Sequence, residues 1–163
     1  MKMTHTEAMK EIKKLEDEKR RLLQEEKATC TVTYTENETP IDTGYSYQET
    51  NKAIIDYDFR IRHLKALLAK SNAITVVKGF DITISEALIY LAQLTQQLER
   101  FQELSLRQPL VREGATYRNA SYEFTKTLYA VKEAKKQYQE CFDLISKLQM
   151  AIDLTNLTTT IDC

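Results

Sequence analysis

The chain has 163 residues, of which 29% are charged, and its 23 basic and 24 acidic residues leave a net charge of -1. This near balance argues against a general electrostatic binder of nucleic acid, which normally carries a basic excess. Only three glycines, two prolines and no tryptophan are present, a composition that predicts long helices with few turns.

The first predicted helix covers about residues 4–28. Thr4 and Glu7 have the spacing of a capping box. Apolar residues then recur at intervals of three and four, with Lys19 in the one seam position that is not apolar; they are Ala8, Ile12, Leu15 and Leu22. This pattern predicts a helix that buries one stripe and exposes its charged remainder to solvent.

The stretch "TCTVTYTE", residues 29–36, interrupts the helical pattern. Threonine alternates there with Cys30, Val32 and Tyr34. Alternation with period two, in β-branched and aromatic residues, predicts a short strand. A strand at this point raises the question of which other segment supplies its hydrogen-bonding partner.

Three further helices are predicted, over about residues 47–71, from residue 83 to a point before Pro109, and over about residues 127–156. Their seams are Ile54, Tyr57, Ile61, Leu64 and Leu68, then Ala87, Leu91, Leu94, Leu98 and Phe101, then Val131, Tyr138, Phe142, Ile145 and Ile152. Spacings of three and four are typical of helices packed on helices. We therefore predict a mainly α fold of four long helices in antiparallel coiled-coil hairpins, forming one domain over residues 1–163.

Two more extended segments are predicted, residues 74–84 around Lys78-Gly79 and residues 117–125. The first reads as a tight β-hairpin. Because a lone strand cannot satisfy its backbone groups, we expect residues 29–36 to pair with residues 117–125 in a small β clasp. The clasp, or an oligomer contact in its place, would be formed by Val32, Tyr34, Tyr122 and Phe124.

The residues that commonly carry chemistry do not converge in the sequence. His5 and His63 lie on predicted helices without metal-ligand spacing, and we interpret them as helix-end and helix-surface residues. Glu140 and Asp143 form an acidic pair, but no second acidic pair is found on another predicted helix that could complete a metal site. Among the cysteines, Cys141 lies on an apolar stripe and is interpreted as core. We predict no catalytic, cofactor-binding or metal-binding residue.

Location is predicted from what the sequence lacks. The N-terminal stretch has no apolar signal core, and the most apolar run, "EALIYLAQL", is far shorter than the roughly 20 residues that span a bilayer. The cysteines, Cys30, Cys141 and Cys163, are odd in number and widely spaced, as expected of reduced thiols. These features predict a cytoplasmic protein with no membrane span.

Several stretches resemble a known family. They are the charged first helix, "SNAITVVKGFDITISEAL", "YEFTKTLYAVKEAKKQYQECFDLISKLQ" and the closing "DLTNLTTTID". Together they resemble an uncharacterised bacterial family, sometimes labelled septicolysin-like. Two positions depart from the pattern of that family, where Ile74 replaces a threonine and Leu157 a tryptophan. The resemblance implies an oligomeric helical coiled-coil fold without an assigned activity.

These observations favour a cytoplasmic scaffold or protein-protein interaction protein that self-associates as a homo-oligomer, and no catalytic function is readable from the residues. Two alternatives stay open at this point. One is a metal-dependent all-α hydrolase, which would use Glu140 and Asp143. The other is a membrane-surface or lytic protein.

Overall fold

A computed structural model describes residues 2–114 and 122–162, and it confirms the mainly α fold with four long helices. The helices are α1 (His5–Thr29), α2 (Tyr47–Ile74), α3 (Ile84–Leu106) and α4 (Val131–Thr158). The short strands are β1 (Lys2–Thr4), β2 (Leu110–Arg112), β3 (Phe124–Lys126) and β4 (Thr160–Asp162). The chain forms two compact units, one of Met1–Thr75 with Thr155–Cys163 and the other of Val76–Leu154. That all of residues 1–163 act as one domain stays a prediction.

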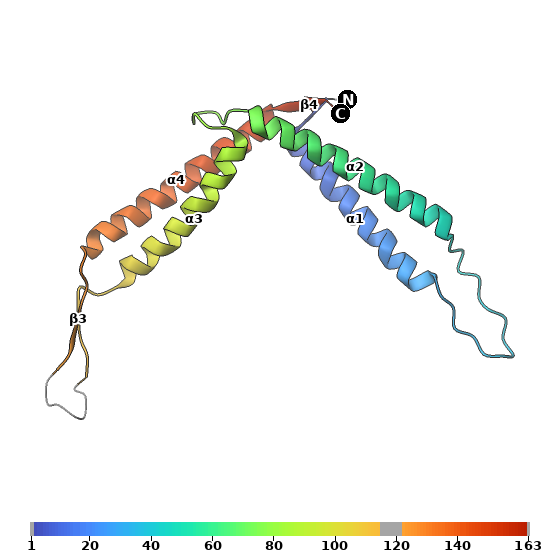
Figure 1. Cartoon of the computed structure of the whole chain (residues 1–163), viewed down its shortest axis with the longest axis horizontal. Helices are drawn as coiled ribbons and strands as arrows, with labels where there is room; N and C mark the ends of the chain where they lie inside the picture. The colour runs from blue at the N-terminus through green and yellow to red at the C-terminus, as the bar shows by residue number, and fades with distance from the viewer. Residues whose placement is uncertain (1, 115–121, 163) are drawn as a thin grey trace. The chain divides into compact units, whose positions relative to one another are not determined.

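The first unit is a helical hairpin of α1 and α2, closed at one end by a two-stranded sheet of β1 and β4 (Figure 1). Its core is a single row of apolar side chains between the helices, with one residue added by β4: Ala8, Ile12, Leu15, Ile61, Leu64, Leu68 and Ile161. The three-four spacing of the sequence therefore has the expected cause, because each buried position faces the partner helix.

Ion pairs between α1 and α2 border this core. The Nζ of Lys19 lies 2.6 Å from Oδ1 of Asp58, and the Nζ of Lys65 lies 2.6 Å from Oε1 of Glu16. Lys19 thus occupies its seam position by laying its aliphatic stem along the core and placing its ammonium at the edge. Exposed pairs of this kind stabilise a fold little, so the apolar row carries most of the helix association.

The second unit is a helical hairpin of α3 and α4. Its core contains Val77, Ile84, Ala87, Leu94, Cys141, Leu148 and Ile152. The thiol of Cys141 donates to the carbonyl of Leu94 at 3.4 Å, and burial raises the pKa of this thiol. Cys141 is therefore a core residue, as the sequence predicted.

Two helices begin in capping boxes, the first of which was predicted from the sequence. Thr4 and Glu7 cap α1, and Thr83 and Glu86 cap α3. In each box the backbone N–H of the threonine donates to the glutamate carboxylate, at 2.7 Å in the first and 2.8 Å in the second. These hydrogen bonds lower the pKa of both glutamates below the ordinary value of 4.5.

The predicted β clasp is wrong. Thr29 is the last residue of α1, and no strand forms over residues 30–46. Of the predicted partner, residues 117–121 lie outside the described part of the chain, and Phe124–Lys126 pairs instead with Leu110–Arg112 as an antiparallel hairpin. The physical reason is loop closure, because the short connection between Arg112 and Phe124 costs less chain entropy to close than the much longer one between residues 29–36 and 117–125.

The pairing of two short strands from the two ends of the chain was not predicted from the sequence. β1 and β4 are antiparallel, with Met3 opposite Ile161. Residues 74–84 form a turn with one isolated bridge, between Val76 and Thr83, rather than a full hairpin. Gly79 occupies the turn with a φ of 86°, a left-handed conformation that glycine adopts without strain.

We expect Leu148→Ala to lower the free energy of unfolding by about 2 to 5 kcal/mol, because it leaves a cavity in a packed core. Leu148 is 0% exposed. The matched control is Met150→Ala on the same helix, which removes a 73% exposed side chain and should change little. Urea unfolding of both variants tests this, and equal losses would contradict the described core.

The capping boxes predict a dependence of stability on pH. Since the folded pKa of Glu7 and Glu86 is lowered from 4.5, their contribution is present above pH 4.5 and is lost as the pH falls through the folded values. The melting temperature of Glu7→Gln/Glu86→Gln should therefore fall less than that of the wild type between pH 6 and pH 3. Glu99→Gln, an exposed change on α3, is the control. An identical fall in wild type and double variant would contradict the prediction.

Candidate functional site

The most enclosed polar group of the first unit is the imidazole of His5, which is 1% exposed. Its Nε2 lies 2.7 Å from Oγ of Ser71, and its Nδ1 lies 3.2 Å from Oδ1 of Asn156. The hydroxyls of Ser71 and Thr75 lie 3.4 Å apart, which extends the contact along α2. We call these four residues the His5 cluster.

Three helix ends meet in the His5 cluster. His5 begins α1, Ser71 lies in the last turn of α2, and Asn156 lies in the last turn of α4. The backbone N–H of His5 also donates to the carbonyl of Thr159 at 3.1 Å, just before β4 begins. The cluster therefore joins the start, middle and end of the chain within one unit.

In the His5 cluster a serine, a histidine and an amide are hydrogen-bonded in the same order as in a hydrolase triad. In such a triad the histidine takes a proton from the nucleophile, and the third group orients the histidine. A substrate would, however, have to reach a serine whose histidine partner is enclosed on every side. In the described part of the chain, no buried side-chain nitrogen or oxygen lacks a hydrogen-bond partner. A fully satisfied buried network of this kind fixes a fold, and we assign the His5 cluster that structural role.

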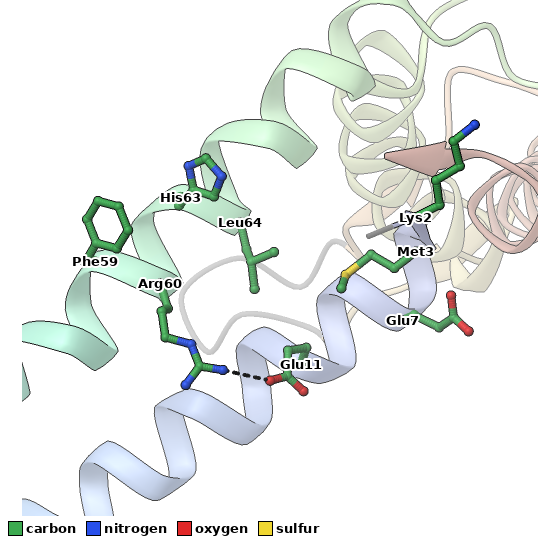
Figure 2. Close-up of a pocket in the computed structure, with 8 residues that line it drawn as sticks. All are labelled: Lys2, Met3, Glu7, Glu11, Phe59, Arg60, His63 and Leu64. Atoms are coloured by element: carbon green, nitrogen blue, oxygen red, sulfur yellow. Dashed lines mark hydrogen bonds and ion pairs between the residues drawn. The ribbon is translucent and has the colours of Figure 1, made fainter. Parts of the chain in front are cut away.

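A hollow of about 570 Å³ lies between α1 and α2 (Figure 2). Figure 2 shows Met3 and Leu64 pointing into the space between the helices, whereas Arg60 and Glu11 meet across it at 3.5 Å. Elsewhere on its rim lie Lys2, Glu7, Phe59 and His63. Because the guanidinium of Arg60 is already paired within the chain, the hollow is a weaker candidate than the two surfaces described next.

Two of the four predicted contact residues, Val32 and Tyr34, lie in the loop that joins α1 to α2. We call residues 31–42 the acidic loop, because Glu36, Glu38 and Asp42 are its charged residues and no lysine or arginine is present. Val32, Tyr34 and Ile41 are all exposed. The loop thus combines apolar side chains with negative charge.

Hydrogen bonds within the acidic loop and at its base hold it in place. Glu38 accepts from the backbone N–H of Thr35 at 3.1 Å, which lowers the pKa of Glu38. Tyr45 donates to Glu26 of α1 at 2.7 Å, which raises the pKa of Tyr45 to about 12. The exposed apolar residues are therefore presented by a loop whose base is attached to the helices.

The other two predicted residues, Tyr122 and Phe124, belong to the β2–β3 hairpin of the second unit. Cross-strand partners share a face, so Arg112 with Phe124, and Leu110 with Lys126, lie on one side of this hairpin. The guanidinium carbon of Arg112 lies 3.5 Å from the ring centroid of Tyr122, which places Tyr122 on the same side. We call Leu110, Arg112, Tyr122, Phe124 and Lys126 the basic hairpin face; all five are exposed.

The opposite side of the hairpin is different. It carries Val111, Glu113 and Thr125, and the hydroxyl of Thr125 donates to Glu113 at 3.2 Å. Acids and small residues thus lie on one side, with aromatic, apolar and basic residues on the other. This difference in charge between the two faces was not predicted from the sequence.

The acidic pair considered for a metal enzyme lies on the surface of α4. Oε1 of Glu140 is 3.7 Å from the Nζ of Lys136, and Asp143 accepts from Gln139 at 3.0 Å. Within residues 2–114 and 122–162, no three histidine, cysteine, aspartate or glutamate side chains gather as a metal site would require. Among these same residues, no helix has the length and apolar character to cross a bilayer.

Comparison with known proteins gives a fold and no activity. No family model and no curated protein matches the chain. A solved structure from Corynebacterium diphtheriae, described as a functionally unknown conserved protein, is similar with a TM-score of 0.68. It is 16% identical in sequence, and the similarity covers 99% of this chain and 100% of that one. The septicolysin-like resemblance stays a prediction.

The His5 cluster predicts that His5→Ala lowers the free energy of unfolding by about 2 kcal/mol or more, because it leaves buried polar groups unpaired. His63→Ala, an exposed histidine of α2, is the control and should change little. A double-mutant cycle with Asn156→Ala should give a coupling of about 0.5 to 3 kcal/mol. Additive losses in that cycle would contradict the contact between His5 and Asn156.

Proposed function

We propose that the protein is a helical scaffold or interaction protein that acts as an assembly of copies of itself. The observation that carries this proposal is its exposed surface. The chain exposes 12663 Å², whereas a compact protein of the same mass exposes about 8,400 Å². Two separate compact proteins of half the mass would together expose only about 10,000 Å². The excess therefore comes from within the units and does not depend on their placement.

The composition of that surface also supports assembly. Large apolar side chains are exposed on the helices as well as on the connecting segments, among them Ile55, Phe59, Ile89, Leu110, Phe124, Leu128 and Met150. Single exposed apolar residues are ordinary, but gathered ones mark interaction surfaces. On the basic hairpin face three of the five residues are apolar or aromatic. Covering such surface against another chain would contribute the burial that a two-helix hairpin lacks.

The two alternatives considered from the sequence receive no comparable support. Glu140 and Asp143 are engaged by neighbours on their own helix rather than by acids of a facing one. No observation on the described residues favours a metal-dependent hydrolase or a membrane-surface protein over self-association. We therefore propose self-association alone.

Light scattering of the purified protein at micromolar concentration tests the proposal. We expect a mass of at least twice the 19.0 kDa of one chain, and we expect this mass to fall on dilution or on addition of a mild denaturant. A mass of one chain at every concentration, with full helical content by circular dichroism, would overturn it.

A further inference from the structure

The acidic loop and the basic hairpin face are complementary in charge. The loop carries Glu36, Glu38 and Asp42, with no basic residue between Cys30 and Ser46. The hairpin face carries Arg112 and Lys126 and no acid, because the two glutamates of the hairpin, Glu113 and Glu123, fall on its other side. Opposite charges on two surfaces steer association and fix the orientation in which the surfaces meet.

The two surfaces also match in their apolar content. Tyr34 is 55% exposed and Phe124 is 60% exposed, and each lies among charged residues of opposite sign to those around the other. Residues 29–36 alternate in sequence, so an extended loop backbone would present Val32 and Tyr34 together on one side. Val32 and Tyr34 would then pack on the aromatic rings and Leu110 of the hairpin face, and the carboxylates of the loop would lie beside Arg112 and Lys126.

We propose that the acidic loop of one copy docks on the basic hairpin face of a second copy. This inference rests on the proposed self-association and specifies the contact that produces it. The contact joins two different surfaces, and each copy offers one of each. Val32, Tyr34, Tyr122 and Phe124 are then neighbours between chains rather than within one.

A second copy fits the basic hairpin face better than a nucleic acid does. Aromatic rings beside cations are also the pattern of a single-strand binding surface. However, residues 107–126 carry only four basic residues against two acidic ones, and the whole chain has a net charge of -1. Binding to a phosphate backbone requires a larger basic excess than this. An acidic and apolar protein loop requires only the two cations and the rings.

Charge exchange between two variants tests the proposal. The first variant, Arg112→Glu/Lys126→Glu, makes the hairpin face acidic, and the second, Glu36→Lys/Asn37→Lys/Thr39→Lys, makes the loop basic. The second leaves Glu38 and Asp42 in place, because their carboxylates accept from loop N–H groups. In each variant alone like charges would meet, and we expect the dissociation constant of the assembly to rise by about tenfold or more, as for other close charge pairs.

Mixing the two variants in equal amounts is the decisive measurement. The acidic face of one then meets the basic loop of the other, while the unchanged loop and face also match, so assembly should return in the mixture. Misfolding of a variant cannot produce this recovery, and circular dichroism of each variant confirms its helices. The control is Glu123→Lys on the opposite side of the hairpin, which should assemble like the wild type. Added salt should weaken the wild-type assembly.

The possible outcomes separate a failure of the docking contact from a failure of self-association. If the wild type is a single chain, both fail. If the wild type assembles but neither variant weakens it, or if the mixture does not recover, the docking contact is wrong while self-association stands. If the first variant assembles normally and instead loses binding to a single-stranded oligonucleotide that the wild type binds, the hairpin face serves a nucleic acid, and the docking contact is likewise overturned.

Discussion

The structure depends on one constraint, which is that a hairpin of two helices buries only one stripe of each. In the first unit that stripe is a single row of residues such as Ala8, Ile12 and Leu15 against Ile61 and its neighbours. Among the described residues of the unit no third layer covers the outer faces, so apolar side chains outside the row stay exposed. A fold of this kind has little core for its length, and much of its apolar surface is left for contact with something else.

The same constraint explains why the ends of the first hairpin are tied by polar contacts. With so narrow a core, the splaying of α1 from α2 is opposed at one end by the His5 cluster and the β1–β4 ladder, and at the other by Tyr45 on Glu26. Hydrogen bonds specify a distance and a direction, which an apolar row does not. The apolar row supplies most of the association free energy, and the polar contacts at its ends fix the register of the helices.

The features that could be predicted from the sequence are those that depend on interactions between residues close together in the chain. The helices were predicted to within a few residues, because spacing and capping boxes such as Thr4 with Glu7 are encoded locally. The burial of His5 was not, since Ser71 and Asn156 reach it from distant positions and nothing local marks them as partners. The predicted strand pairing was wrong for a related reason. Alternation at Val32 and Phe124 indicates an extended conformation, but it does not indicate which segment is the partner. The four contact residues were nonetheless found in exposed segments, where contact with another molecule stays open.

The charge pattern shows why a whole-chain average is a poor guide to such a protein. A net charge of -1 argues against polyanion binding, but it hides the separation of charge between the acidic loop and the basic hairpin face. In the proposed docking contact, the acidic loop of one copy attracts the basic hairpin face of a second copy, and surfaces of the same sign repel each other. Loop would therefore not pair with loop, nor face with face. This selectivity follows from where the few charges of the connecting segments lie, and the helices serve to present those segments.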